Sequence, residues 1–451
     1  MSSRRIFKVI ITAFAAILMC AGYLGAEEQS SYSPSLVYVS GNNLMFAWRC
    51  PDGSLEKTKP LIFRGVTWAA ATQAPHDGPN PLNNSESVPY GFFFDWEGRS
   101  PQGHEVFAYW LTREYAKYYD VDIGYMKRMN VNVVRVYTHF GLAPREYTRI
   151  LDKFYDKKIM VILTVAGSKR EIDSGEYLKV VNAYKDHPAI LMWSLGNEWN
   201  LDYNRYHGYQ TIKEAAQATD HAAGEIKKID PGHPVSTCLG DRFVDDEAEN
   251  TVAAVVQLCP NIDIWGFNVY RGKSFGSLFS QWEKISEKPM YISEFGTDSF
   301  YTQNYKIAND FQAIACVGQK DEDMQAQYIL GLWEEISDNL SALYENKQCL
   351  GGLVHEFNDE LWKVGCYHVD MGDMIDYDFP EQGYSYTEYN TEGFYLPGGH
   401  PDDVANEEFF GVMDAQRNPK KVFIQLQNYY EKLSFTGEYT FKGCSDAGTL
   451  K

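Results

Sequence analysis

Eight short runs rich in apolar and β-branched residues recur along the chain, separated by longer stretches with helical spacing of their apolar residues. Several runs, IMVILTV and ILMWSL among them, are almost uninterrupted apolar strings, as expected for strands buried on both faces. Parallel strands need crossover connections of about a dozen residues or more, usually helices. The alternation therefore predicts a parallel sheet with strands at residues 61–68, 131–138, 159–165, 190–196, 234–239, 263–270, 289–295 and 350–357.

The segments between these runs have the length and periodicity of helices. The clearest patterns occupy residues 144–157, 209–228 and 321–346. Eight strand–helix units are the number that closes a (β/α)8 barrel. The alternative is an open, doubly wound sheet, but no glycine-rich phosphate loop follows the first run. We therefore predict an α/β fold, a single (β/α)8 TIM barrel over residues 61–435.

The sequence also indicates what lies outside the strand–helix units. Residues 35–60 indicate a small β-hairpin that closes the bottom of the barrel, within an N-terminal extension at 27–60, and residues 436–451 are expected to be a tail. Connections 69–120, 296–320 and 358–418 follow strands and far exceed the usual two to six residues. Since segments after strands lie at the catalytic face of such a barrel, we expect them to wall a substrate groove.

Residues 1–26 have the layout of a secretory signal peptide. Basic residues precede an apolar run that ends at Cys20, and small residues follow up to Ala26. The run is shorter than the roughly 20 residues of a membrane span, so export is favoured over a retained anchor. A lipoprotein anchor at Cys20 is the other alternative, but Met19 is bulky for its recognition motif. The expected location is secreted or periplasmic, with no stable membrane span.

The number and spacing of the cysteines are compatible with export. Of the 8 cysteines, Cys20 belongs to the signal, which leaves an odd number that cannot all pair. Export permits disulfides, and Cys349 and Cys366 flank a predicted strand and loop as a candidate pair. The wide spacing contains no CxxC or Cys/His cluster, so no structural zinc site is expected.

Composition excludes some partners and favours others. The chain has 61 acidic against 41 basic residues, a formal charge of -20, which would repel nucleic acid and anionic lipid. Aromatic residues make up 15% of the chain. Their flat faces suit stacking on sugar rings as well as core packing, so a carbohydrate is a candidate partner. Composition does not fix the oligomeric state.

Two of the predicted strands end in carboxylates. Glu198 follows WSLGN, and Glu294 lies in PMYISEFG. A carboxylate at the end of a buried strand is paired, solvated in a cleft or functional. About three strand–helix units separate the two, which places them on the fourth and seventh strands, across the barrel mouth. Two such carboxyls about 5 to 5.5 Å apart suit retaining glycoside cleavage, in which one protonates the leaving oxygen and the other attacks the anomeric carbon. The alternative is a pair of ordinary strand-end acids.

WSLGNEWN resembles the WS-x-x-NE signature of family 2 glycoside hydrolases and of clan A, and ISEFG is similar to their nucleophile motif. Residues 122–135 also resemble the clan's second strand and the helix before it. The resemblance spans most of residues 60–430 and is specific for the clan, though only weakly for substrate. It implies that Asn197 holds the sugar 2-hydroxyl, Glu198 is the acid/base and Glu294 the nucleophile.

Further residues are candidates for support or substrate binding. Tyr270, in FNVY, matches the clan's aromatic or His that hydrogen-bonds the nucleophile, and Arg135 would orient Glu294. The alternatives are rim packing for Tyr270 and a structural ion pair for Arg135. Candidates at or just past strand ends, for sugar contact or rim packing, are Trp68, Tyr137, His139, Trp199, His355, Glu356 and Trp362. No carboxylate–histidine spacing accompanies the histidines, so neither a metal nor a cofactor is expected.

The sequence departs from family 2 in ways that bear on substrate. Family 2 places β-sandwich domains before its barrel, whereas a short segment stands there in this sequence. GGLVHE resembles the GGLVYE segment of yeast-type β-1,3-glucanosyltransferases, and NEEFFGV is similar to a closing motif of bacterial single-barrel relatives. We therefore expect a retaining β-glycoside hydrolase acting on a β-linked polysaccharide or oligosaccharide, with a β-glucan as the leading substrate. The alternatives are a β-1,3-glucanosyltransferase-type transglycosidase and a non-catalytic carbohydrate-binding barrel.

Overall fold

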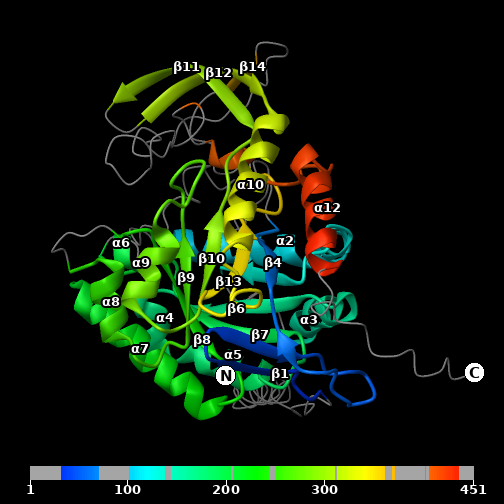
Figure 1. Ribbon diagram of the computed structural model, residues 1–451. Coiled ribbons are helices and arrows are strands. Elements are labelled where there is room, and N and C mark those ends of the chain that lie inside the picture. Colours follow the sequence, from blue (N-terminus) through cyan, green and yellow to red (C-terminus); the bar gives the residue numbers. More distant parts are fainter. Residues whose placement is uncertain are drawn as a thin grey trace, which may run out of the picture. The chain divides into compact units, whose positions relative to one another are not determined.

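The computed structural model describes residues 32–70, 101–137, 144–204, 207–243, 249–309, 312–360, 368–370, 402 and 406–435. Eight parallel strands close into a barrel in the order β10-β13-β4-β5-β6-β7-β8-β9 (Figure 1). Each overlaps one of the predicted runs, so the (β/α)8 prediction is confirmed. The strands are β4 (Phe63–Thr67), β5 (Val133–Val136), β6 (Met160–Ala166), β7 (Ile190–Leu195), β8 (Val235–Gly240), β9 (Ile264–Asn268), β10 (Met290–Phe295) and β13 (Cys349–Val354).

Helices follow the strands around the barrel. They are α2 (Pro101–Arg128), α3 (Pro144–Lys157), α4 (Lys169–Ser174), α5 (Glu176–Tyr184), α6 (Trp199–Asp202), α7 (Ile212–Ile229), α8 (Val252–Leu258), α9 (Leu278–Ile285), α10 (Glu322–Ser337) and α12 (Lys421–Phe435). Side-chain caps set several starts, since Thr211 accepts from the Glu214 amide at α7 and Asp321 from the Met324 amide at α10. The expected helix at 321–346 ends early, at Ser337, and turns follow.

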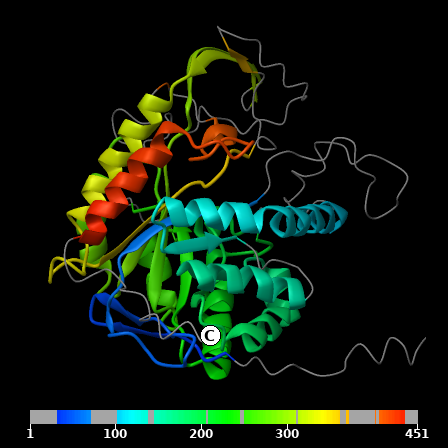
Figure 2. The ribbon, with the colours of Figure 1, turned by 90° about the vertical axis from the view of Figure 1, so that its right-hand side faces the viewer.

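Helices α10 and α12 lie side by side against the β13 and β4 side of the barrel (Figures 1 and 2). The Trp333 ring packs edge-on against Tyr430, with centroids 5.1 Å apart. Arg64, on β4, donates to the Tyr430 carbonyl at 3.0 Å. The last described helix is thereby tied to the first barrel strand, which closes the outer ring.

Three short strands lie within the predicted N-terminal extension. Strands β1 (Leu36–Ser40), β2 (Asn43–Ala47) and β3 (Lys59–Pro60) form an antiparallel sheet. Leu44 and Phe46 belong to one buried cluster with barrel-interior residues such as Met160 and Met192. The hairpin thus fills the N-terminal end of the barrel with apolar side chains, and the opposite end is left for chemistry.

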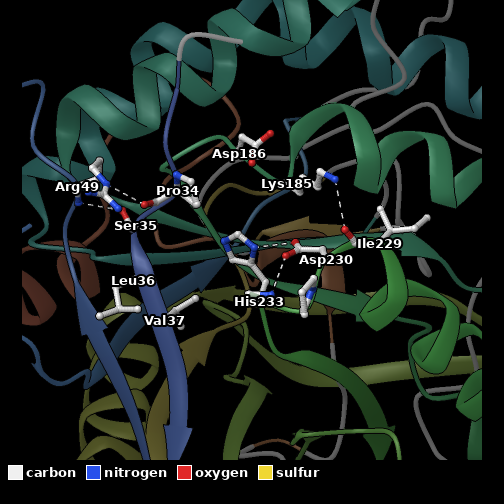
Figure 3. Close-up of a pocket in the computed structure, with 12 residues that line it drawn as sticks. Pro34, Ser35, Leu36, Val37, Arg49, Lys185, Asp186, Ile229, Asp230 and His233 are labelled. Carbon is white, nitrogen blue, oxygen red and sulfur yellow. Dashed lines mark hydrogen bonds and ion pairs between the residues drawn. The ribbon is translucent and has the colours of Figure 1, made fainter. Parts of the chain in front are cut away.

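A cavity of about 320 Å³ lies beside this hairpin (Figure 3). Its lining includes Ser35, Arg49 and Lys185, together with Asp230 and His233. Asp230 binds His233 Nδ1 at 2.7 Å and also accepts from the Trp193 indole at 2.7 Å. These contacts fasten the segment between α7 and β8 to the side of β7. The cavity involves the N-terminal ends of the strands and none of the candidate site residues.

All three long connections contain regular structure that the sequence did not indicate. Within 69–120, helix α2 already begins at Pro101. Within 296–320, an antiparallel hairpin forms from β11 (Phe300–Asn309) and β12 (Gln312–Lys320), and β14 (His368–Asp370) pairs with β12. The predicted signal peptide and most of connection 358–418 lie outside the described residues. Among the described helices, none has the length and apolar character to cross a membrane.

The proposed Cys349–Cys366 pair is wrong. Cys349 is a free, buried thiol at the start of β13, and its Sγ lies 3.4 Å from the Gly351 carbonyl oxygen. Because Cys349 lies in a barrel strand, its side chain points into the packed interior of the protein and away from the loop that follows the strand. Cys50 is disulfide-bonded instead, and Cys238 and Cys259 are free and buried.

A buried ion pair offers a test of this packing. Asp122, on α2, accepts two hydrogen bonds of 2.9 Å from Arg417 and one of 3.0 Å from the Trp68 indole. Asp122→Asn would leave the buried guanidinium without its counter-charge, so we expect a loss of about 3 kcal/mol in the free energy of unfolding, measured by urea titration. The control is Asp120→Asn, two positions earlier, where the carboxylate is 67% exposed and pairs with Lys153. That change should cost less than about 0.5 kcal/mol. Equal losses in the two variants would contradict the interpretation.

Candidate active site

Glu198 sits on a sharp turn at the end of β7. Gly196 has φ of 73°, and Glu198 itself has φ of 50° and ψ of 21°, the left-handed region that non-glycine residues seldom occupy. The Glu198 amide donates to the Cys238 carbonyl on β8 at 2.9 Å, which holds the turn in place. The turn presents Asn197 and Glu198 at the barrel mouth, where both are half-buried.

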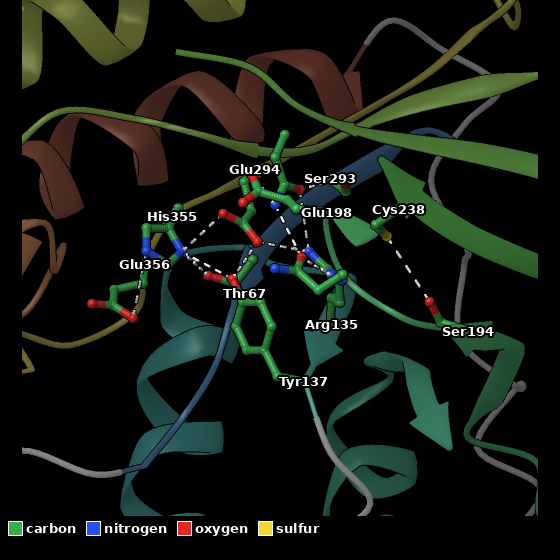
Figure 4. A network of polar contacts seen from close by, with 12 residues as sticks. Thr67, Arg135, Tyr137, Ser194, Glu198, Cys238, Ser293, Glu294, His355 and Glu356 are labelled. Atoms are coloured by element: carbon green, nitrogen blue, oxygen red, sulfur yellow. Dashed lines mark hydrogen bonds and ion pairs between the residues drawn. The ribbon is translucent and has the colours of Figure 1, made fainter. Parts of the chain in front are cut away.

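Glu294 lies within β10, the seventh barrel strand in chain order, while Glu198 follows the fourth. Glu294 is 6% exposed, and its carboxylate receives three hydrogen bonds, of which Figure 4 shows those from Arg135 and Tyr137. Arg135 Nη1 and the Tyr137 hydroxyl donate to Oε1 at 2.9 and 2.7 Å, and the Tyr270 hydroxyl donates to Oε2 at 3.0 Å. The structure therefore brings together around Glu294 two residues of β5 and its end, Arg135 and Tyr137, and Tyr270 from just past β9.

A second set of contacts joins this cluster to Glu198. Arg135 Nη2 donates to Asn197 Oδ1 at 2.7 Å. The Asn268 amide group donates to Asn197 Oδ1 and to Glu198 Oε1, both at 3.0 Å. Ser293 Oγ donates to Asn268 Oδ1 at 2.7 Å, which fixes the amide orientation. The two carboxylates thus belong to one hydrogen-bond network.

Sequence reasoning missed Asn268 and Ser293. The signal was present but weak, because each is an uncharged polar residue inside an otherwise apolar strand, in IWGFN and MYISEF. A polar side chain at an inward-facing strand position needs a partner. The three-dimensional structure is needed to identify the partners: Asn268 donates to Asn197 and Glu198, and Ser293 donates to Asn268.

The electrostatics of the network keep its donors protonated. Burial raises the pKa of Tyr137 well above its usual value, and the charge of Glu294 raises it further, so this phenol remains a donor. Burial acts against the charge of Arg135, but Cys238, Tyr137 and Glu294 outweigh it and raise the pKa of the guanidinium. Arg135 is fully buried, and a buried charge is tolerated when it is paired and hydrogen-bonded, as here.

His355 and Glu356 follow β13, beside Glu294. His355 Nδ1 lies 3.0 Å from the Tyr137 hydroxyl, 3.0 Å from Thr67 Oγ1 and 3.8 Å from Glu294 Oε2. Gly296 permits this approach, since a Cβ there would stand 2.4 Å from the His355 carbonyl oxygen. The sequence did not indicate Thr67, whose hydroxyl completes the group.

The remaining sequence candidates fall elsewhere. Trp68 and Trp199 are buried, and their indoles donate to Asp122 Oδ2 at 3.0 Å and Thr237 Oγ1 at 2.8 Å. The structure places both in the core, where neither ring has a free face for a sugar. His139 and Trp362 lie outside the described residues. Among the residues that the structure describes, no group of three His, Cys, Asp or Glu side chains could hold a metal ion.

Two glutamates in one network at the ends of the fourth and seventh strands of a (β/α)8 barrel suit glycoside cleavage. Residues 159–337 match the family model "Glycosyl hydrolases family 2, TIM barrel domain". The predicted resemblance to the family 2 barrel is therefore confirmed over these residues.

The similar proteins are larger than this chain. The β-glucuronidases of Rattus norvegicus and Sus scrofa are 26% and 24% identical to it over 126 and 191 residues. These matches cover 27% and 40% of this chain but only 18% and 27% of the two relatives. Among solved structures, the β-glucuronidase of Faecalibacterium prausnitzii matches with 16% identity and a TM-score of 0.48, over 88% of this chain and 52% of its own.

The two-pronged contact of Arg135 gives a test of the site. Arg135→Lys keeps the positive charge, but a lysine ammonium lacks the planar guanidinium that contacts both Glu294 and Asn197. We therefore expect kcat/KM on an accepted aryl glycoside to fall about 100-fold. Arg64→Lys is the matched control, because that guanidinium donates to the Tyr430 carbonyl outside the barrel, away from the carboxylates. A similar loss of activity in both variants, at equal folded fraction by circular dichroism, would count against the role of Arg135.

Proposed function

We propose that the protein is a retaining β-glycoside hydrolase that works by double displacement, with Glu294 as nucleophile and Glu198 as acid/base. The observation that carries the proposal is the network in which Arg135 and Asn268 link the two carboxylates. Three donors hold the Glu294 carboxylate in one orientation, as an attacking group requires. Glu198 accepts a hydrogen bond from the Asn268 amide group at 3.0 Å and is half-buried.

The roles follow from the chemistry of the two steps. In the first, Glu198 gives its proton to the leaving oxygen while Glu294 attacks the anomeric carbon, so the glycosidic bond breaks as an ester forms. In the second, Glu198 takes a proton from water, which attacks the same carbon and releases Glu294. Asn197, held by Arg135 and Asn268, is placed to bind the sugar 2-hydroxyl.

The names of the relatives bear on the substrate. They are β-glucuronidases, which makes a β-glucuronide the first substrate to propose, ahead of the β-glucan expected from the sequence. One observation favours a neutral sugar instead. Three cations near this end of the barrel are each held by a carboxylate of the chain: Arg135 by Glu294, Arg271 by Asp241 and Lys420 by Asp359. A uronate would have to share one of them or find another donor.

A panel of 4-nitrophenyl β-glycosides tests the function and the substrate together. We expect release of nitrophenol from a β-glycoside, with the β-glucuronide compared directly with the β-glucoside, and with laminarin as the polymeric glucan. Proton NMR of the first product should show the β-anomer, because two inversions restore the configuration. Initial α-anomer would overturn retention. Products longer than a starting oligosaccharide would assign a transglycosidase, and binding without turnover would assign a carbohydrate-binding barrel.

The two glutamates should fail in different ways. Glu294→Gln removes the nucleophile at nearly constant shape, so turnover should be lost on every substrate while thermal unfolding stays unchanged. Glu198→Ala should retain glycosylation by aryl glycosides with good leaving groups and should form a β-glycosyl azide when azide is added, since a small anion replaces the missing base. Mass spectrometry of the products distinguishes the two. Absence of azide product from a substrate that the variant still cleaves would reassign Glu198.

We further propose that the protein is exported, on the basis of the signal-like pattern in residues 1–26. Detection of the chain outside the cytoplasm, shortened near Ala26, is the direct measurement.

A further inference from the structure

The hydroxyl of Tyr137 lies between two acceptors. It is 2.7 Å from Glu294 Oε1 and 3.0 Å from His355 Nδ1 (Figure 4). A phenol has one proton, so Tyr137 donates to one of these groups at a time. Tyr270, the other phenol on Glu294, contacts the second carboxylate oxygen and packs against His355 only through its ring, with centroids 6.3 Å apart. The two phenols are therefore not equivalent.

The surroundings of His355 suit Nδ1 to act as an acceptor. Its other ring nitrogen, Nε2, lies 3.9 Å from Glu356 Oε2, and a nearby carboxyl oxygen favours the tautomer with the proton on Nε2. Nδ1 then faces two hydroxyls, those of Thr67 and Tyr137, both at 3.0 Å. While Tyr137 donates to Glu294, Thr67 can donate to Nδ1, so the nitrogen is satisfied in either arrangement.

We propose that Tyr137 is a positioning residue that exchanges acceptors during the reaction: it donates to Glu294 while that group is a carboxylate, and to His355 Nδ1 while Glu294 is a glycosyl ester. The inference rests on the proposed double displacement. A hydrogen bond to a carboxylate is charge-assisted and about twice as strong as one to a neutral acceptor. Ester formation removes that charge, so the imidazole becomes the better acceptor. When the ester breaks, the returning charge draws the phenol back.

The exchange predicts opposite effects on the second step. Tyr137→Phe leaves the ester intact but deprives the departing carboxylate of a donor, so deglycosylation should slow. His355→Leu deprives the phenol of its acceptor in the ester state, which raises the energy of that state, so deglycosylation should quicken. His355→Asn keeps a polar group near the Nδ1 position, so its effect should be smaller than that of His355→Leu. A purely structural role would slow the reaction in both the tyrosine and the leucine variants.

The experiment measures the second step alone. The enzyme is trapped with 2-deoxy-2-fluoro-β-D-glucosyl fluoride and with the corresponding glucuronosyl fluoride, excess reagent is removed, and loss of the adduct is followed by intact-protein mass spectrometry. We expect the adduct of Tyr137→Phe to decay about ten-fold more slowly and that of His355→Leu about three-fold faster, with His355→Asn between His355→Leu and the unsubstituted protein. Tyr155→Phe is the matched control, since that phenol donates to the Arg49 carbonyl beside the N-terminal hairpin.

The outcomes separate this inference from the proposed function. If the unsubstituted protein forms no adduct with either fluoride, the covalent mechanism fails and this inference fails with it. If the adduct forms but decays at equal rates in all variants, or more slowly in both Tyr137→Phe and His355→Leu, the exchange is overturned and the double displacement stands. Thermal unfolding of each variant confirms that the adduct resides on folded protein.

Discussion

The contact between Arg135 and Glu294 is the interaction on which the catalytic end of the barrel depends. The guanidinium is fully buried on β5, and removal of its partner would leave a charge in a dry interior. Its two nitrogens reach β10 through Glu294 and the end of β7 through Asn197. Because the fork is planar and rigid, those two groups are held at a fixed separation, and Asn268 then completes the link to Glu198.

The interior of the barrel changes character along its axis. At the N-terminal end, hairpin residues such as Phe46 pack with Met160 and Met192 in an apolar cluster. Nearer the site, Tyr291 and Cys238 face each other, with the hydroxyl 3.2 Å from the sulfur, and burial raises the pKa of Tyr291 well above its usual value. Above them stands the charged layer of Arg135 and Glu294. The charged groups are thus confined to the layer at the C-terminal end of the barrel strands, and the layers beneath it are apolar or uncharged. A mostly apolar core can therefore carry Glu198 and Glu294 at one end.

The sequence predicts those parts of the molecule that leave a local signature. All eight barrel strands could be located because strands buried on both faces are short apolar strings, and Glu198 and Glu294 stand out because they end such strings. Trp68 and Trp199 are candidates for sugar contact or rim packing on the ground of position alone. A strand-end position does not say which way a ring points, and the Trp199 ring turns back against Gly196, whose added Cβ would lie 2.6 Å from it. The hairpin of β11 and β12 has mixed polar and apolar residues, and its pairing is visible only in three dimensions.

The backbone of Glu198 carries a further implication. Its left-handed conformation, at φ of 50°, suits glycine or asparagine better than glutamate, by about 1 kcal/mol. Stability alone would therefore favour a different residue at this turn. A variant with glycine in place of Glu198 would relax the turn, so the substitution that removes the proposed acid/base would also raise the free energy of unfolding.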